Sequence, residues 1–262
     1  MMKNLFSLEG RTALITGGSR GIGKMIAQGF LESGAKVYIS ARKAEQCDAT
    51  AAELSKFGKC ISLPHDVSTV DGCKALAAHY CTFEKSLDIL VNNAGAAWGA
   101  PFEEFPESGW DKVMDLNVKS LFFLTQALYN ELKTAASADR PGKVINIASI
   151  DGIKINPWET YPYQASKAAV IHLTRRMAAR LIKDNICVSA IAPGAFPSDM
   201  NRAARDAGDA VSQMIPAKRI GRDEDMAGTA VFLASKAGDY VVGDTLAVDG
   251  GVAYCSITEA WA

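Results

Sequence analysis

The sequence predicts an α/β fold in which a doubly wound parallel sheet carries helices on both faces. Two observations lead to this prediction. Short apolar runs alternate with longer helical stretches along the whole chain, and several of these runs contain almost no polar residue. Such runs are typical of parallel strands that are covered on both faces. Right-handed crossovers then leave few possible strand orders.

The predicted strands are short and rich in β-branched residues, which favour extended backbone. The first two read TALIT and KVYIS, and the fourth reads LDILV. In chain order the strands are Thr12–Thr16, Lys36–Ser40, Cys60–Leu63, Leu87–Val91, Lys143–Ile147, Ile186–Ile191 and Thr245–Val248. Helices are expected between them, at Gly23–Ser33, Ala44–Phe57, Val70–Phe83, Ser108–Ala135, Tyr163–Ile182 and Asp223–Ala234.

One domain is the economical interpretation of this pattern. No Pro/Gly/Ser-rich linker and no internal repeat divides the chain, so residues 1–262 are predicted to form a single domain. The alternation breaks between Pro193 and about Pro216. We interpret residues 194–216 as a lid, with a plain surface excursion as the alternative.

Composition excludes several classes of protein. Of the 262 residues, 48% are hydrophobic and 22% are charged, which is ordinary for a globular protein and excludes a disordered one. Lys plus Arg number 28 against 29 for Asp plus Glu, so no basic footprint for nucleic acid exists. We expect no membrane partner, no leader peptide and a cytoplasmic location, since no apolar run reaches about 18 residues. The six cysteines and three histidines lack metal-ligand spacing, so we expect no metal site.

A glycine-rich turn follows the first predicted strand. Residues 16–23 read TGGSRGIG and open a helix. Glycines at this junction let the backbone approach a pyrophosphate closely, and the helix N-terminus offers free N–H groups and a positive dipole end. The spacing G-x-x-x-G-x-G departs from the more familiar G-x-G-x-x-G. The turn therefore predicts a dinucleotide site of a distinct type.

The end of the second strand indicates which dinucleotide binds. An NAD site normally places Asp or Glu there for the ribose 2′-hydroxyl, but this chain has Arg42 and Lys43, with Arg20 inside the glycine turn. Guanidinium groups bind a 2′-phosphate well. The residues thus favour NADP(H) over NAD(H), although Lys43 alone fits a solvated helix start.

Tyr163 and Lys167 have the spacing of a catalytic pair. Side chains at i and i+4 of a helix lie over one another, and an ammonium beside a phenol lowers the tyrosine pKa. Ser149 ends a predicted buried strand, from where its hydroxyl can polarise a substrate carbonyl. Taken alone such a pair is usually structural, but its conjunction with the glycine turn favours chemistry.

A series of ordered motifs resembles the short-chain dehydrogenase/reductase family over nearly the whole chain. They are TGGSRGIG at 16–23, Asp66-Val67, NNAG at 92–95, Asn117, Ser149, YQASK at 163–167, Pro193-Gly194 and Asp249-Gly250-Gly251. The resemblance implies a Rossmann-type domain with a seven-stranded parallel sheet. It also implies a catalytic tetrad, which comprises Asn117, Ser149, Tyr163 and Lys167.

The resemblance assigns a role to each of these positions. Tyr163 is the general acid in reduction and Ser149 orients the carbonyl. Lys167 holds the nicotinamide ribose and lowers the Tyr163 pKa, while Asn117 supports a water that leads protons to Lys167. The implied cofactor-binding residues are Gly17, Ser19, Arg20, Gly21, Ile22, Gly23, Arg42, Asp66, Val67, Asn93, Ala94, Gly95, Tyr163, Lys167, Pro193, Gly194 and Ser198, the last standing where the family often has Thr.

Substrate contacts are expected from Ser149 and Tyr163 and from the loop that carries Asp151 and Trp158, for which plain loop surface is the alternative. Tyr161 cannot form the Tyr/Lys pair because Ala165 stands four residues on, so we expect it to line the substrate entrance or to pack.

Two helical stretches carry more apolar residues than one face against a sheet requires. They are Trp110–Leu132 and the helix that begins at Tyr163. We interpret the excess as a two-fold interface of a homodimer or homotetramer, with a purely internal core as the alternative.

Among members of the family, the chain resembles 3-oxoacyl reductases, including the rhamnolipid type. The substrate would then be a 3-oxoacyl group on acyl carrier protein or CoA, and an acidic carrier could dock on basic residues that we expect to be exposed, namely Arg140, Lys143, Arg175, Arg176 and Arg180. The alternative is a reductase of a sugar, polyol or other secondary alcohol. A non-catalytic NADP(H)-binding sensor is the third hypothesis, which the intact Ser149, Tyr163 and Lys167 disfavour.

Overall fold

The structure is a computed structural model that describes residues 4–198 and 202–255. Its strands form one parallel sheet of seven strands in the order β3-β2-β1-β4-β5-β6-β7. In chain order they are β1 Thr12–Thr16, β2 Lys36–Ser40, β3 Cys60–Ser62, β4 Ile89–Asn92, β5 Gly142–Ile147, β6 Ile186–Pro193 and β7 Thr245–Val248. The predicted Rossmann-type α/β fold is confirmed.

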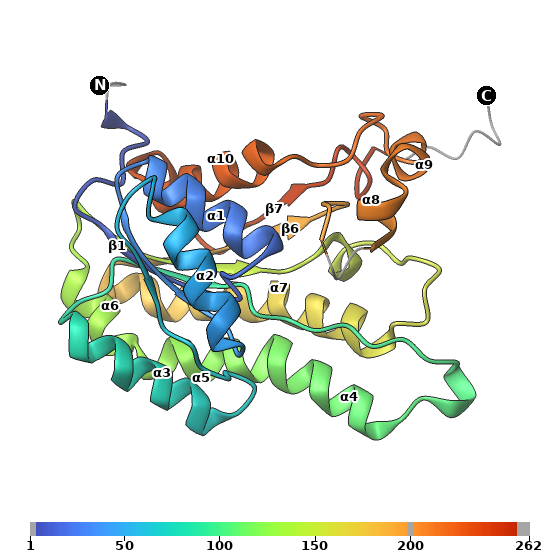
Figure 1. The fold of residues 1–262 in the computed structure, drawn as a ribbon, viewed down its shortest axis with the longest axis horizontal. Helices are drawn as coiled ribbons and strands as arrows, with labels where there is room; N and C mark the ends of the chain where they lie inside the picture. Colours follow the sequence, from blue (N-terminus) through green and yellow to red (C-terminus); the bar gives the residue numbers. More distant parts are fainter. Residues whose placement is uncertain (1–3, 199–201, 256–262) are drawn as a thin grey trace.

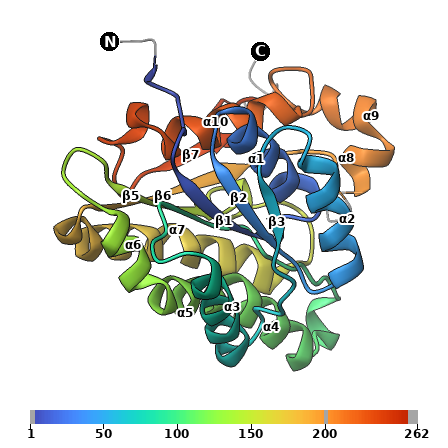
Figure 2. The same ribbon diagram turned by 60° about the vertical axis from the view of Figure 1, so that its left-hand side comes forward.

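Helices cover both faces of this sheet (Figures 1 and 2). One face is covered by α1 Gly21–Glu32, α2 Ala44–Leu54 and α10 Asp223–Ala234. The other is covered by α3 Val70–Phe83, α4 Glu107–Met114, α5 Ser120–Ala127, α6 Tyr129–Ala135 and α7 Tyr161–Leu181. The segment predicted as a lid holds α8 Arg202–Asp206 and α9 Gly208–Gln213, while residues 199–201 of it lie outside the described residues. Short 3-10 turns are η2 Phe102–Glu104, η4 Ile150–Gly152, η5 Ile182–Asp184 and η6 Lys236–Gly238.

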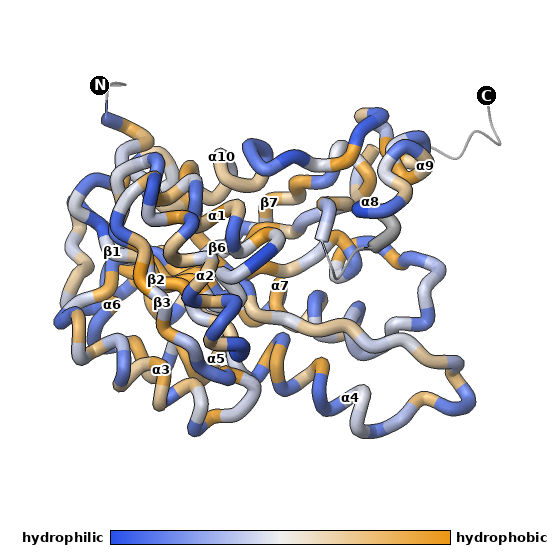
Figure 3. The backbone as a smooth tube through the Cα atoms, viewed as in Figure 1, coloured by the Kyte–Doolittle hydropathy of each residue, from blue (hydrophilic) through white to orange (hydrophobic). Residues whose placement is uncertain are grey.

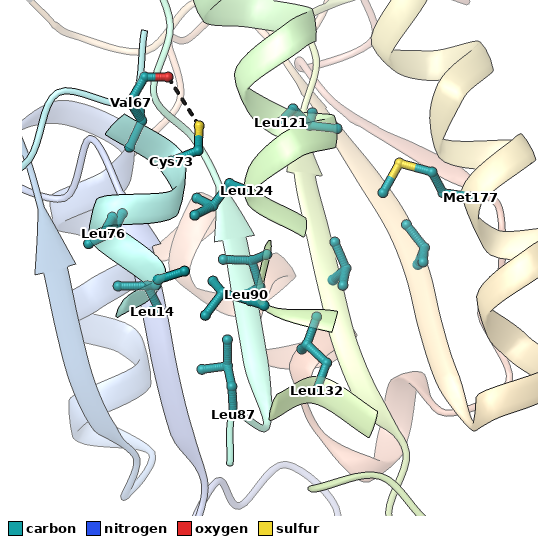
Figure 4. Packing of buried hydrophobic residues seen from close by; sticks show 14 of the residues in the cluster. Leu14, Val67, Cys73, Leu76, Leu87, Leu90, Leu121, Leu124, Leu132 and Met177 are labelled. Atoms are coloured by element: carbon teal, nitrogen blue, oxygen red, sulfur yellow. Dashed lines mark hydrogen bonds between the residues drawn. The ribbon is translucent and has the colours of Figure 1, made fainter. Parts of the chain in front are cut away.

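Alternation along the strands divides the core into two layers. Leu14, Leu90 and Val144 stand side by side in register and pack against α3, α5 and α7 (Figure 4). Their neighbours Ile15 and Val91 point to the opposite face and pack against α1 and α10. The strands are therefore apolar on both sides, as parallel strands between helices require, and the apolar segments converge on the sheet (Figure 3).

The helix expected over Ser108–Ala135 is interrupted twice. Asp115–Lys119 forms a π-helical turn between α4 and α5, and Leu128, with φ −101° and ψ 10°, separates α5 from α6. A π turn inserts one extra residue into the helical ladder and is common at functional sites. Here it carries Asn117, whose side chain is bonded to neighbouring elements as described below.

The strand order reverses at β1, whose neighbours are β2 and β4. In open α/β sheets this point, at the carboxyl ends of the strands, leaves a crevice for ligands. The glycine turn, the loop after β4 and Ser149 after β5 all begin at these ends. Within the described residues no helix has the length and apolar character to cross a membrane, and no group of three or more potential metal ligands occurs.

Candidate active site

The glycine turn joins β1 directly to α1. Gly17 and Gly21 have φ values of +64° and +50°, a region that side chains disfavour. A Cβ atom on Gly23 would lie 2.3 Å from the Gly17 carbonyl oxygen, so only glycine fits there. No side chain caps the helix at Arg20, which leaves the first backbone N–H groups of α1 available to an anion. Ser198 lies over this turn, with its Cβ 3.4 Å from where a Cβ on Gly21 would stand.

The loop after β4 is fixed to the glycine turn by hydrogen bonds. The Asn93 amide donates to the carbonyl oxygens of Thr16 and Gly17, at 2.9 and 3.1 Å. The Thr16 hydroxyl accepts the backbone N–H groups of Asn93 and Ala94, both at 3.0 Å. Thr16 was not predicted as a site residue, although it stands directly before the first glycine of the turn. These bonds hold the glycine turn and the loop after β4 in one rigid unit.

Arg42 lines a cavity of about 230 Å³ beside this unit. The other lining residues are Ser68, Thr69, Gly95, Ala96, Lys112, Asp115 and Leu116. Asp66 accepts the Ser68 N–H at 2.9 Å and Val67 is buried, so both residues shape the loop that borders the cavity. Lys112 was not predicted as a site residue because its position on α4 gives no local signal. Its ammonium lies 5.0 Å from the centre of the Trp98 ring.

Ser149, Tyr163 and Lys167 meet beyond the end of β5. Tyr163 and Lys167 stand one turn apart on α7, and the Lys167 Nζ lies 5.5 Å from the centre of the Tyr163 ring. Ser149 lies close enough to the Tyr163 hydroxyl for its side chain to lower the pKa of the phenol. The buried Lys167 ammonium donates to the Ile147 carbonyl oxygen at 2.8 Å, which fixes it to the end of the same strand. The sequence spacing thus brings a hydroxyl, a phenol and an amine together.

The expected lowering of the Tyr163 pKa by Lys167 is not found in this structure. Burial raises the pKa of Tyr163 to about 12, the Ser149 side chain opposes this rise, and the Asp151 charge adds to it. Lys167 does not reverse the shift because burial lowers its own pKa to about 8 and its ammonium is bonded to a carbonyl instead. Tyr163 is therefore a protonated phenol at neutral pH, which is the form that donates a proton.

Asn117 is almost fully buried, and its amide ties three elements together. Its Oδ1 accepts the Ala96 N–H at 2.8 Å, and its Nδ2 donates to the Ala96 carbonyl at 3.0 Å and to the Ser166 hydroxyl at 2.9 Å. The Ser166 hydroxyl in turn donates to the Tyr163 carbonyl at 2.7 Å. Both amide donors are thus engaged, so the side chain connects the cofactor loop to α7 as a strut. Ser166 was not predicted as a site residue.

The predicted substrate loop carries charged and aromatic groups. Asp151 is half-buried, and its backbone N–H donates to the Ser149 hydroxyl at 3.1 Å. Trp158 is 66% exposed. Tyr161 packs edge-on against Phe102 and Phe105, with ring centres 5.6 and 5.8 Å apart.

Pro193 ends β6, and the following Gly194 donates its N–H to Val248 on the β7 side. A second cavity, of about 260 Å³, lies between the residues after Gly194 and the glycines after β7.

The sequence matches the family model described as Enoyl-(Acyl carrier protein) reductase over residues 17–253. The chain belongs to the short-chain dehydrogenase/reductase family. It is 50% identical to the rhamnolipids biosynthesis 3-oxoacyl-[acyl-carrier-protein] reductase of Pseudomonas aeruginosa, over 95% of this chain and 99% of that protein. It is 39% identical to a 2-dehydro-3-deoxy-D-gluconate 5-dehydrogenase of Dickeya dadantii, over 96% and 98%. The solved Pseudomonas aeruginosa RhlG/NADP active-site complex superposes with a TM-score of 0.93 at 49% identity, over 96% of this chain and all of that one.

One expectation about the surface of this short-chain dehydrogenase/reductase is wrong. Lys143 is buried, with its Nζ 2.7 Å from Asp239 Oδ1, because β5 runs through the middle of the sheet. It cannot receive an acidic carrier. Arg140 pairs with Asp88 at 2.9 Å, and Arg180 pairs with Asp184 at 2.6 Å. Both of these arginines are exposed, and so are Arg175 and Arg176 on α7.

The apolar excess of Trp110–Leu132 is mostly core in this family member. Six of its apolar residues are buried, namely Val113, Leu116, Leu121, Leu124, Leu128 and Leu132. Trp110 and Phe122 remain exposed, at 43% and 39%. On α7, Val170, Ile171 and Met177 are buried as well. The outward apolar surface of these helices is thus smaller than the sequence pattern predicts.

Proposed function

We propose that this short-chain dehydrogenase/reductase is an NADPH-dependent 3-oxoacyl reductase that converts the ketone of a 3-oxoacyl thioester to a secondary alcohol. The observation that carries the proposal is a protonated Tyr163 phenol that lies beside Ser149 and one helical turn from Lys167. The substrate class is supported by the 50% identity with a relative that is named a 3-oxoacyl-[acyl-carrier-protein] reductase.

The chain fits NADP(H) at the carboxyl edge of the sheet. A cradle that admits only glycine at Gly23 and an uncapped helix N-terminus suit a pyrophosphate, and Arg42 on the neighbouring cavity suits a 2′-phosphate. The residues that would hold the cofactor are those given by the family resemblance, with Thr16 added as the residue that fixes their loops. When bound, NADPH supplies the hydride.

Each residue of the tetrad has a separate task in this proposal. Ser149 orients and polarises the ketone oxygen, and Tyr163 donates the proton that this oxygen needs as the hydride arrives. Lys167, fixed to the Ile147 carbonyl, presents its charge to the cofactor ribose and to the proton path. Asn117 keeps the loop at Ala96 and α7 at a fixed distance.

Consumption of NADPH, followed by its absorbance, tests the function. The panel comprises 3-oxoacyl thioesters, the matching enoyl thioesters, neutral ketones and ketogluconates. We expect the 3-oxoacyl thioesters to be reduced with the highest kcat/KM. Preference for a ketogluconate would favour the second candidate, a sugar-acid reductase, which the 39% identity with the gluconate-type relative supports. Tight NADPH binding with no turnover of any compound would favour a sensor.

A Tyr163→Phe variant tests the proton donor. The ring and its packing remain while the hydroxyl is lost, so NADPH affinity should be kept and turnover should fall by about 10²–10⁴-fold. Unchanged turnover would show that another group donates the proton.

The setting of the enzyme is also a proposal. The chain acts as a single domain with a lid at 194–216, works in the cytoplasm as a homodimer or homotetramer and accepts its substrate from acyl carrier protein or CoA. The exposed Trp110 and Phe122 support association through α4 and α5. Sedimentation velocity of the wild type and of a Phe122→Asp variant tests this, since a monomeric wild type would contradict the oligomer.

A further inference from the structure

Asp151 is held between two residues of the tetrad. It lies in the short turn η4, directly after Ser149, and its backbone N–H is bonded to the Ser149 hydroxyl at 3.1 Å. The turn cannot shift away from α7, because a Cβ on Gly152 would already lie 2.5 Å from the Lys167 carbonyl carbon. The backbone of Asp151 is thus held beside the Ser149 hydroxyl, and its short side chain cannot lie far from that group.

Burial has the largest effect on the Asp151 carboxyl and raises its pKa, while Asn156 and the charge of Lys167 act against this rise. Because the residue is half-buried, a charge on this carboxylate is poorly screened by solvent. Among the described residues, Asp151 is the carboxylate whose charge acts on both Tyr163 and Lys167.

A fixed negative charge beside the reacting carbonyl discriminates between substrates by charge. A 3-oxoacyl thioester is neutral around its ketone, whereas a free 3-oxo acid or a ketogluconate brings a carboxylate into the same space. Two like charges in a poorly screened site repel each other strongly.

We propose that Asp151 is a specificity-determining residue that admits esterified 3-oxoacyl groups and excludes substrates with a carboxylate near the ketone. This inference rests on the proposed function for its natural substrate. A hydrolysed substrate would then not compete with the carrier-bound one.

The test uses pairs of ketones that differ in charge. Ethyl acetoacetate and acetoacetate share the same ketone, and D-fructose and 2-ketogluconate form a second pair, in which the carboxylate stands next to the ketone. The full-length enzyme is compared with Asp151→Asn and Asp151→Ser, which remove the charge but keep the backbone N–H on Ser149. Asp151→Glu retains the charge. Glu159→Gln is the matched control, because it removes an exposed carboxylate of the same loop.

The ratio of kcat/KM for the neutral over the anionic member of a pair is the readout. We expect a ratio of about tenfold or more in the wild type, in Asp151→Glu and in Glu159→Gln, and a fall toward unity in Asp151→Asn and Asp151→Ser. Any general loss of activity affects both members and cancels in the ratio.

A ratio that is the same in the wild type and in both neutral variants would overturn the proposal. If the ester and thioesters are not reduced at all, the proposed function fails, and the fructose pair still measures the discrimination by Asp151 independently.

Discussion

Replacing Asn117 with alanine distinguishes two roles of this residue: a structural strut, which holds the loop at Ala96 to α7, and a proton relay. The side chain is 3% exposed and makes three hydrogen bonds, two to Ala96 and one to the Ser166 hydroxyl. Each is worth about 1 kcal/mol of net stability, so their loss should lower the free energy of unfolding by about 3 kcal/mol. In a chain of this size that corresponds to a fall in Tm of roughly 6–12 °C.

The same change should weaken cofactor binding. Ala96 and Arg42 line the same cavity. Without the Asn117 side chain, the loop at Ala96 is no longer held in place beside this cavity. The assays are urea unfolding of the apo protein and the KM for NADPH. Ser166→Ala is a graded control, because it removes one of the three Asn117 bonds together with the Ser166 bond to the Tyr163 carbonyl and should cost about 2 kcal/mol.

One result would refute this reasoning. If Asn117→Ala unfolds at the wild-type urea midpoint and keeps the wild-type KM for NADPH while kcat falls by about tenfold or more, the strut is not what the residue contributes. The relay that the family resemblance implies would then be assigned to the side chain itself.

Three further changes have defined outcomes. Because burial lowers the Lys167 pKa to about 8, its ammonium loses its proton as the pH rises through that value, and kcat/KM for ketone reduction should fall above about pH 8 in a pH-rate profile. Asp239→Ala leaves the buried Lys143 charge unpaired and should lower the free energy of unfolding in urea by about 3 kcal/mol. Adding Lys143→Met removes the unpaired charge and should restore most of this free energy. Arg42→Asp should shift the KM ratio toward NADH by roughly tenfold to hundredfold, and an unchanged ratio would remove the 2′-phosphate assignment.

Local patterns in the sequence predicted the fold and the centre of the site. Alternating apolar strands and helices define a doubly wound sheet because each strand must be covered on both faces. The spacing of Tyr163 and Lys167 is set by one helical turn, and the glycines lie within a single strand–helix junction. Such features need no information about distant parts of the chain.

Features that depend on distant partners could not be predicted. Lys143 stands in a strand where a lysine normally faces solvent, and only the packing of β5 against β6 brings Asp239 close enough to pair with it. The hydrogen bonds of the Asn117 side chain depend on Ala96 and Ser166, which come from other elements. The pKa of Tyr163 rises because the phenol is buried, and no spacing rule contains burial.

Polar residues inside the predicted apolar strands indicate buried hydrogen-bond networks. Asn146 lies fully buried in β5 and joins Asn92 to Thr174 through bonds of 2.9 Å. An asparagine in the run KVINI conflicts with an apolar strand and therefore indicates a buried network. The sequence therefore contains a signal for the buried network of Asn92, Asn146 and Thr174.

The anchoring of the catalytic groups has a consequence for the diversification of this enzyme. Lys167 is fixed by a backbone carbonyl of β5, and Asn117 is fixed largely by the backbone of Ala96. None of these anchors involves the side chains of residues 153–160, which belong to the loop that we propose contacts the substrate. Mutations in that loop can therefore accumulate without disturbing the reduction chemistry. Selection and laboratory engineering can change what is reduced while how it is reduced stays constant.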